Sequence, residues 1–353
     1  MIKKNCYILL MLLLLCLMAG CSKTKNLCEV ALITDEGTVE DGSFNEGAFN
    51  GVKKYCEEKG VLYSYYKPEG ISLDNYMSSI DKAVSDGAKI IVCPGYMLEE
   101  AVYYGAEKYP KINFVLVDGT PHDSEFNDYT IAENVSCLLF AEEQAGFMAG
   151  YAAVRDGYTR LGFLGGMAED PVIRYGYGFI QGADYAAIEM GIKVYLAYTY
   201  TGTFLEDDSV YNTASTFYDN SVEIIFACGG EMNKSVMKSA EERGKAVIGA
   251  DIDQSALSPS VVFSCTKNLE DGVYNALNDY YSGAFKGGQE IKLTAADGGV
   301  AIPLENGKFN TFSDIEYTAI YREISTGKIV PYSNTDIGTT AELELVNTEI
   351  IYQ

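Results

Sequence analysis

Short apolar runs alternate with longer amphipathic stretches through most of this 353-residue chain, and this alternation limits the folds open to it. Candidate strands in the first part of the chain lie at 29–34, 61–66, 89–94 and 112–118. Candidate helices fill the gaps, at about 43–60, 72–86 and 97–109. Strands that alternate with helices of this length form βαβ units, whose strands pair in parallel. The first part of the chain therefore predicts an α/β lobe with a parallel sheet.

The same alternation repeats further along the chain, after a helix expected at about 138–156. Four more candidate strands lie at 159–164, 193–200, 223–230 and 246–251. The helices between them are expected near 171–190, 206–219 and 231–244. Because a domain commonly holds about 150 residues, the chain length also favours two units. We therefore expect two Rossmann-like lobes.

The segments that follow are too short for a third domain, since they comprise only a helix at about 267–286 and a strand at 298–303. We expect them to return to the first lobe and complete it. The predicted boundaries are 29–135 with about 265–318 for lobe 1, and 136–264 with about 319–353 for lobe 2. A chain that crosses between lobes more than once would form a hinge beside a cleft.

The N-terminus has the pattern of a secretory signal peptide. Two lysines supply the positive start, an apolar run covers 7–18, and small residues precede Cys21. The run is too short to span a bilayer, which takes about 20 residues. The ending LMAGC resembles a lipobox, in which the cysteine becomes the lipid-bearing N-terminus; a plain secretory signal with a chance cysteine is the alternative. We expect residues 1–20 to be removed and residues 21–28 to form a lipidated tether.

The composition argues against several classes of partner and chemistry. Asp and Glu outnumber Lys and Arg by 50 to 26, and binding to nucleic acid needs a basic face, so we expect no nucleic-acid partner. The cysteines that follow Cys21 form no CxxC pair and several lie in apolar runs, which favours buried free thiols over a metal site. A disulfide between two of these six cysteines is the alternative. We expect neither a metal nor a cofactor. Three acidic pairs are interpreted as solvated helix faces: Glu99-Glu100, Glu142-Glu143 and Asp207-Asp208.

Polar and aromatic residues gather in the loops that follow the expected strands, where parallel sheets present ligands. In the loop after the first strand, Asp35 suits an Asx-turn. Ser43 with Glu46 suits a capping box for the next helix. Phe44 stands at the exposed first turn of that helix, where a large apolar ring needs a reason. Each of these residues alone is a weak signal.

Their order along the chain resembles the basic membrane protein (BMP) family, whose members include purine nucleoside receptor lipoproteins. The likeness runs from about residue 29 to about residue 303, and DGSFN at 41–45 and GADIDQ at 249–254 are its most specific stretches. Gly42 stands where the family often has another residue. The other matches include Asp35, Asp118, Asn134, Gly150, Gly165, Gly166, Gly178, Phe179, Gly182, Ser264 and Lys267. The resemblance implies the type I periplasmic-binding-protein fold, with a multi-crossover hinge between the lobes.

By the same resemblance, a base would lie between aromatic rings while acids and amides hold its edge and the ribose. Phe44 would stack on the base, with Asp35 and Asn45 beside it as polar contacts. Phe204 is the candidate second ring, and Tyr175 is its rival. The other implied contacts are Asp118 and Asp251 for the sugar hydroxyls, with Ser43, Gly229 and Lys267 as further contacts.

The resemblance thus implies a monomeric, extracytoplasmic substrate-binding lipoprotein of an ABC importer, which catalyses nothing. It would capture purine nucleosides such as guanosine, inosine or adenosine and pass them to a membrane permease. Chemistry supports such a site, because a stacked side chain contributes about 1–3 kcal/mol to binding a base and carboxylates accept hydroxyl hydrogen bonds strongly. An acidic site would also repel phosphate, which favours nucleosides over nucleotides.

Three alternatives stay open. The same fold could bind a sugar or a signalling molecule. An extracytoplasmic nucleoside hydrolase would need a ribose-binding acid cluster, typically with a divalent metal and several aspartates close together; Asp251 and Asp253 are two residues apart, with no adjacent DxDxxxDD. The third alternative is an adhesin or antigen with no small ligand.

We predict that Cys21 is the mature N-terminus and carries lipid, because small residues before it end a charged, apolar leader. The anchor would hold the protein on the cell membrane, facing the extracellular or periplasmic side. Mass spectrometry of protein extracted from membranes should find a chain that begins at a lipid-modified Cys21. A chain that begins elsewhere, or an unmodified Cys21, would contradict the prediction.

Overall fold

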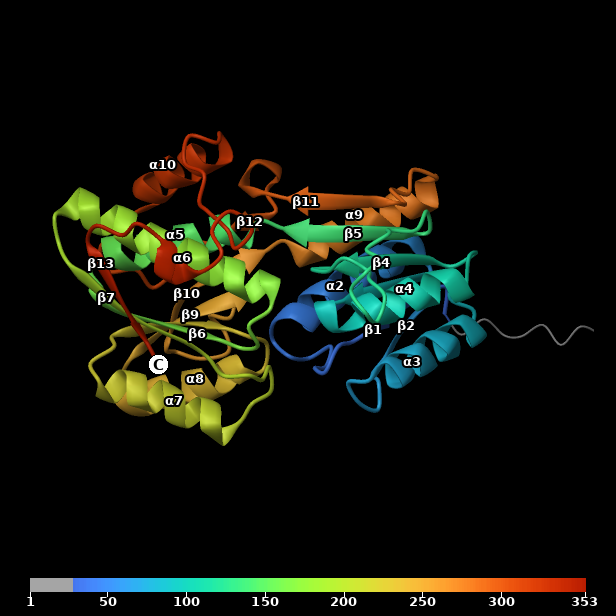
Figure 1. The fold of residues 1–353 in the computed structure, drawn as a ribbon, viewed down its shortest axis with the longest axis horizontal. Coiled ribbons are helices and arrows are strands. Elements are labelled where there is room, and N and C mark those ends of the chain that lie inside the picture. Colours follow the sequence, from blue (N-terminus) through green and yellow to red (C-terminus); the bar gives the residue numbers. More distant parts are fainter. Residues whose placement is uncertain (1–27) are drawn as a thin grey trace, which may run out of the picture.

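The computed structural model describes residues 28–353, which form two α/β lobes lying side by side (Figure 1). The expected signal peptide, Cys21 and all but the last residue of the expected tether lie outside the described residues. Within residues 28–353, we find no helix with both the length and the apolar character needed to cross a membrane.

The first lobe is built on a six-stranded sheet in the order β11-β5-β4-β3-β1-β2, with all neighbouring strands parallel. The strands are β1 (Val30–Ile33), β2 (Tyr63–Tyr66), β3 (Ile90–Pro94), β4 (Asn113–Val117), β5 (Val135–Phe140) and β11 (Gln289–Leu293). The helices around it are α2 (Phe44–Lys59), α3 (Leu73–Ser85), α4 (Glu99–Lys108) and α9 (Leu269–Ser282), with the short η1 (Tyr96–Leu98).

The second lobe is built on a seven-stranded sheet in the order β12-β10-β9-β8-β6-β7-β13. Its strands are β6 (Arg160–Gly165), β7 (Val194–Tyr200), β8 (Ile224–Cys228), β9 (Ala246–Asp251), β10 (Val261–Lys267), β12 (Val300–Ala301) and β13 (Thr348–Tyr352). β12 runs antiparallel to β10, and the other neighbours are parallel. The remaining helices are α5 (Glu142–Arg155), α6 (Asp170–Met190), α7 (Asp208–Asp219), α8 (Met232–Arg243) and α10 (Asp314–Ser325), with the short η2 (Ala295–Asp297) and η3 (Thr340–Glu342).

Both sheets repeat one topology. Without the outer strands β11, β12 and β13, the first sheet runs β2-β1-β3-β4-β5 and the second runs β7-β6-β8-β9-β10. The order reverses between β1 and β3 and between β6 and β8. Open parallel sheets bind ligands in the crevice outside the carboxyl ends of the strands at such a reversal point. The duplicated topology therefore gives each lobe a ligand-binding edge.

The strands are apolar runs because helices cover both faces of each sheet. Successive residues of a strand point to opposite faces. In β8, Ile224 and Phe226 pack in the core that includes α5 and α6, whereas Ile225 and Ala227 pack in the core that includes α7 and α8. Figure 1 shows α7 and α8 on the side of the second sheet opposite α5 and α6.

The expected strands β1 to β4 and β6 to β9 are confirmed to within a few residues. The helix expected at about 138–156 is partly wrong, because 135–140 form β5 and α5 begins only at Glu142. An apolar run such as Leu138-Leu139-Phe140 has no periodicity that distinguishes a buried strand from a buried helix.

Strand pairing also moves the expected lobe boundaries. β5 lies in the first sheet, so lobe 1 extends past residue 135. β10 and β12 lie in the second sheet, so 261–267 and 300–301 belong to lobe 2, although residues from about 265 to 318 were expected in lobe 1. The physical reason is that β12 returns beside β10 and completes that sheet's edge instead of extending the first sheet.

The chain crosses between the lobes three times, after β5, after β10 and after β11. Backbone hydrogen bonds tie the crossing segments together. Ala141 N donates to the Leu293 carbonyl oxygen at 2.9 Å, and Asn268 N donates to the Gly299 carbonyl oxygen at 2.8 Å. A few torsions in such a connection can open or close the two lobes, which is the geometry of a hinge.

Helices α5 and α6 approach closely because glycines line their contact. A Cβ atom added at Gly182 would lie 1.9 Å from the Phe147 carbonyl oxygen, and one added at Gly178 would lie 2.0 Å from the Glu143 carbonyl oxygen. Any side chain at these positions would force the two helices apart. Gly178 and Gly182 therefore serve helix packing.

We predict that Gly182→Ala destabilises the second lobe. Overpacking a close contact typically costs about 1–3 kcal/mol, so the melting temperature measured by calorimetry should fall by several degrees. Gly338→Ala is the matched control, because an added Cβ there meets nothing within 4 Å. Equal melting temperatures for the two variants would contradict the packing role.

Candidate functional site

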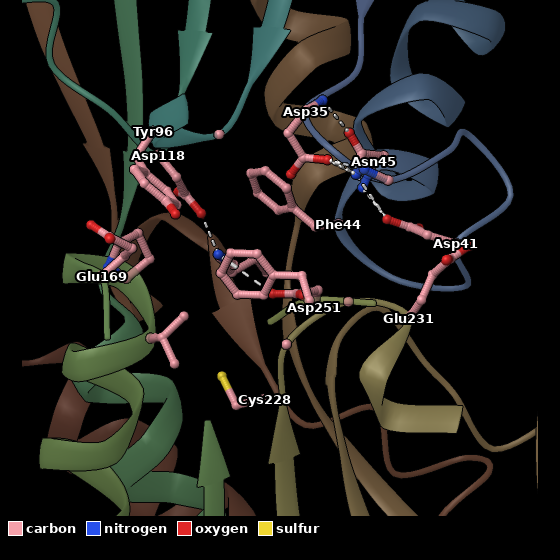
Figure 2. Close-up of a pocket in the computed structure, with 18 of the residues that line it drawn as sticks. Asp35, Asp41, Phe44, Asn45, Tyr96, Asp118, Glu169, Cys228, Glu231 and Asp251 are labelled. Carbon is pink, nitrogen blue, oxygen red and sulfur yellow. Dashed lines mark hydrogen bonds and ion pairs between the residues drawn. The ribbon is translucent and has the colours of Figure 1, made fainter. Parts of the chain in front are cut away.

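A pocket of about 660 Å³, measured with its open mouth, lies between the two lobes. Figure 2 shows Phe44 standing between Asp35 and Asn45 on one side and Asp118 and Tyr96 on the other. The pocket is lined by Asp35, Gly37, Asp41, Phe44, Asn45, Gly95, Tyr96, Asp118, Glu169, Pro171, Val172, Tyr175, Phe204, Cys228, Gly229, Gly230, Glu231, Asp251 and Lys267.

The structure brings the predicted binding residues together. All of them except Ser43 line this pocket, although they come from loops as far apart in sequence as Asp35 and Lys267. Ser43 lies directly behind the lining, where its Oγ donates a hydrogen bond to Asp251 Oδ2 at 2.8 Å. That bond crosses from lobe 1 to lobe 2.

Asp118 and Asp251 occupy equivalent positions in the two lobes. Asp118 follows β4 and Asp251 ends β9, and these strands hold the same place in the duplicated order. Both residues have a left-handed backbone, with φ of 59° and 68°. Residues other than glycine rarely adopt this conformation. Where they do, the residue often belongs to a functional site. The equivalence means that each sheet contributes one carboxylate from the same point of its edge.

The loop after β1 folds around its own carboxylates. Asp35 forms the expected Asx-turn, because Gly37 N donates to its Oδ1 at 2.7 Å. The same oxygen accepts a hydrogen bond from Asn45 Nδ2 at 2.8 Å. Burial raises the pKa of Asp35. The turn thus fixes a carboxylate and an amide beside the Phe44 ring.

The capping box expected from Ser43 and Glu46 is wrong. Asp41 caps α2 instead, because its carboxylate accepts from the backbone N of Ser43 at 2.8 Å, of Asn45 at 2.9 Å and of Glu46 at 3.1 Å. A carboxylate has two oxygens and reaches several of the unpaired N–H groups at a helix start. The Ser43 hydroxyl is thereby left for Asp251.

Lys267 places a buried cation in the pocket, with 4% of its surface exposed. Its ammonium donates a hydrogen bond to Asp118 and lies 3.4 Å from Asp251 Oδ1 and 3.5 Å from Glu142 Oε1. Burial alone would lower the pKa of Lys267, but attraction to Asp118, Asp251 and Glu142 outweighs burial and raises it. The lysine is therefore charged and joins carboxylates from both lobes.

Glu142 corrects the interpretation of the acidic pairs as solvated faces. Its side chain is fully buried and accepts a hydrogen bond from Arg174 Nε at 2.7 Å. Burial would raise the pKa of Glu142, but Arg174 and Lys267 outweigh burial and lower it. Sequence alone gives no sign of this pairing, because Arg174 lies 32 residues further along the chain.

Asp118 offers a hydrogen-bond acceptor to the pocket. Its side chain is buried, with 5% of the residue exposed, and Oδ1 has no hydrogen-bond partner among residues 28–353. Burial raises the pKa of Asp118, and the Lys267 ammonium opposes that rise. A buried acceptor without a partner costs free energy, so a donor group on a bound molecule would be favourable here.

Two half-buried phenylalanines line the pocket from opposite lobes. The Lys267 ammonium lies 4.8 Å from the centroid of the Phe44 ring, within the range of a cation–π contact. The Phe204 ring meets Tyr96 edge-on, with the two centroids 6.4 Å apart. Phe44 and Phe204 are therefore both placed to contact a flat ligand.

Tyr175 is packed differently from Phe204. Only 1% of it is exposed, its ring lies edge-on to Phe226 at a centroid distance of 5.5 Å, and its hydroxyl donates to the Cys265 carbonyl oxygen at 3.5 Å. These contacts belong to the core of lobe 2. The geometry thus favours Phe204 over Tyr175 as the partner ring of Phe44.

The sequence analysis misses Tyr96 and Glu169, which also line the pocket. Tyr96 follows β3, and a loop at the reversal point of a parallel sheet is itself a signal that would have identified it. Glu169 stands at the start of α6, where burial and the charge of Asp170 raise the pKa of its carboxyl. The structure is needed to show that this carboxyl reaches the pocket.

The expectation of buried free thiols is confirmed for the part of the chain that the structure describes. Burial raises the pKa of Cys228, which lines the pocket as a neutral group. The free cysteines are Cys28, Cys56, Cys93, Cys137, Cys228 and Cys265. From residue 28 onward, no group of three or more His, Cys, Asp or Glu side chains is arranged to hold a metal ion.

The chain is similar to known proteins over most of its length. It is 28% identical over 307 residues to the ABC transporter nucleoside-binding protein BmpA of Lactococcus lactis subsp. cremoris, which covers 80% of this chain and 84% of that protein. It is 30% identical over 324 residues to basic membrane protein B of Borrelia garinii subsp. bavariensis, which covers 90% of each chain.

Solved structures share the fold. The ABC transporter solute-binding protein from Aeropyrum pernix K1 superposes with a TM-score of 0.75 at 24% identity, covering 88% of this chain and 95% of that chain. The solute-binding protein from Conexibacter woesei gives a TM-score of 0.67 at 18% identity, covering 86% and 98%. At these identities the likeness concerns the fold alone, and it confirms the type I periplasmic-binding-protein fold.

The family model described as "ABC transporter substrate-binding protein PnrA-like" matches residues 28–333, which include the whole pocket, the first sheet and every strand of the second sheet except β13. Proteins of this kind work outside the cytoplasm, bind a small molecule and have a membrane permease as partner. The chain therefore belongs to the Bmp family of PnrA-like ABC transporter substrate-binding proteins.

Proposed function

We propose that the pocket binds a purine nucleoside, and that the protein, a monomer anchored by lipid at Cys21, delivers it to an ABC permease. The observation that carries the proposal is the half-buried ring of Phe44 next to the buried Oδ1 of Asp118, which has no hydrogen-bond partner among residues 28–353. A base offers a flat face and a ribose offers hydroxyl donors. A nucleoside joins both groups in one molecule.

The base would stack on Phe44 from lobe 1 and meet Phe204 from lobe 2. Each stacked ring contributes about 1–3 kcal/mol to binding a base, with little dependence on which base is bound. Asp35 and Asn45 lie beside Phe44 and would hold the edge of the base. Because these residues belong to both lobes, a bound base would favour the closed arrangement.

The ribose would lie at the carboxylates around Lys267. Asp118 Oδ1 accepts one hydroxyl, and Asp251 stands at the equivalent point of the other sheet. Carboxylates outnumber cations along the pocket lining, so a phosphate group would be repelled. The lining carboxylates are Asp35, Asp41, Asp118, Glu169, Glu231 and Asp251, against the ammonium of Lys267.

Similarity to a relative that is named a nucleoside-binding protein supports the same ligand class. Two other functions stay in view as outcomes of the tests. A sugar would use the carboxylates without the ring of Phe44, and a signalling molecule of another class would do without the ribose contacts. A nucleoside hydrolase would release free base when the purified protein is incubated with inosine or guanosine, whereas a binding protein returns the nucleoside unchanged.

We predict that Phe44→Ala weakens guanosine, inosine and free guanine alike. Loss of about 1–3 kcal/mol of stacking corresponds to a roughly five- to hundredfold weaker dissociation constant. Titration calorimetry measures the dissociation constant of each ligand for wild type and variant. Phe49→Ala is the matched control, because Phe49 lies in the same helix but packs on Tyr63 and Tyr65 outside the pocket. Guanosine bound equally well by wild type and Phe44→Ala would contradict the stacking role.

We predict that Asp118→Asn weakens guanosine much more than free guanine. Asparagine keeps the size of the side chain and tolerates the left-handed backbone. The loss of the charged acceptor costs roughly 1–3 kcal/mol, so nucleoside affinity should fall about five- to hundredfold. Asp253→Asn is the control, because Asp253 binds Asn306 outside the pocket.

Calorimetry with guanosine, guanine and ribose on the same proteins separates the possible results. A wild-type protein that ignores purine nucleosides but binds ribose or another sugar would show that the ligand class is wrong. An Asp118→Asn variant that binds guanosine as tightly as wild type would show that the ribose lies elsewhere.

A further inference from the structure

Gln254 of the DIDQ loop does not line the pocket. Gln254 is fully buried, at 0% exposure, and its amide makes contacts on both sides of the cleft. Nε2 donates to the Gly42 carbonyl oxygen of lobe 1 at 2.8 Å. Oε1 accepts from Asn233 Nδ2 at 3.1 Å and from Ala250 N at 3.2 Å, both in lobe 2. The amide therefore joins lobe 2 directly to the loop that presents the binding residues of lobe 1.

Contacts within lobe 2 fix the position of the Gln254 side chain, whose Nε2 bonds to Gly42 of lobe 1. The backbone N of Gln254 donates to Ser264 Oγ at 2.9 Å, so its main chain is fixed as well as its amide. Gly249 leaves the room that this arrangement needs, because a Cβ added there would lie 2.7 Å from Gln254 Oε1 and 2.6 Å from Ser264 Oγ. The motif residues Gly249, Gln254 and Ser264 thus form one assembly.

The segment of lobe 1 that receives this contact is short and specialised. Gly42 has a left-handed backbone, with φ of 71°, and a Cβ atom there would lie 2.8 Å from Leu257 Cδ1 of lobe 2. The next residue, Ser43, donates to Asp251 at 2.8 Å. Phe44 and Asn45 follow at once. Lobe 2 therefore contacts Gly42 and Ser43, which directly precede Phe44 and Asn45 in the chain.

We propose that Gln254 is a positioning residue: its bond to Gly42, which we call the interlobe latch, holds the lobes closed over the ligand without touching it. When the lobes separate, Gln254 Nε2 and the Gly42 carbonyl oxygen lose each other as partners and must be hydrated again. Closure pairs them in a buried setting, where an unpaired polar group is costly. The latch therefore slows ligand release and holds Phe44 and Asn45 in register with lobe 2.

The latch predicts a kinetic signature. Gln254→Met keeps the size of the side chain but removes the donor, so the dissociation rate of guanosine should rise about tenfold. The association rate should not fall, because ligand enters the open form and the variant populates that form at least as much as wild type does. Scattering should give the ligand-free variant a larger radius of gyration than ligand-free wild type, while the two bound forms agree.

Gln181→Met is the matched control, because the Gln181 amide bonds Tyr177 and Tyr332 within lobe 2 and does not cross the cleft. Gln254→Asn is a second variant that keeps an amide but shortens its reach, and it serves if Gln254→Met fails to fold. Stopped-flow dissociation and scattering give both readouts on the purified mature protein.

The kinetic readout rests on the proposed nucleoside function, whereas scattering of ligand-free protein does not. If wild type fails to bind guanosine, the nucleoside proposal is wrong. The radii of gyration of ligand-free wild type and the ligand-free Gln254 variants still test whether the latch holds the lobes together. Release rates and radii of gyration that are the same for both Gln254 variants, Gln181→Met and wild type would overturn the latch.

Discussion

The buried ammonium of Lys267 is the contact on which the site depends. It ends β10 next to one lobe crossing, and it meets Asp118 from lobe 1, Asp251 from lobe 2 and Glu142 beside another crossing. Without this cation three carboxylates would stand buried together, and removing one partner of a buried charge network typically costs about 3–5 kcal/mol. The charge balance of the cleft and the joining of the lobes therefore rest on one residue.

The duplicated strand order explains how so many acids reach one point. In the first sheet the strand order reverses between β1 and β3, and in the second sheet it reverses between β6 and β8. A ligand fits at the carboxyl ends of the strands at such a reversal. Asp118 at the end of β4 and Asp251 at the end of β9 occupy equivalent positions in the two sheets, and both have a left-handed backbone. The site is therefore made of two similar halves that face each other, with Lys267 and a ligand between them.

Much of this could be predicted from the sequence, because buried parallel strands are apolar runs and because motif residues follow strand ends. β5 could not be predicted, since the run at 138–140 has no helical or strand period. The roles of Glu142 and Gln254 could not be predicted either. Each depends on a partner more than 30 residues away in sequence, Arg174 or Gly42, that only the folded chain brings near. Asp41, and not Ser43, caps α2, because a carboxylate reaches more of the backbone N–H groups at the start of the helix.

The central claim is that the cleft holds a purine nucleoside between the two halves. A crystal structure of the mature protein grown with guanosine tests it most directly. The account predicts a base stacked on Phe44 and a ribose hydroxyl within hydrogen-bonding distance of Asp118 Oδ1, at about 2.5–3.0 Å. Guanosine bound outside the interlobe pocket, or a ribose turned away from Asp118 and Asp251, would contradict it.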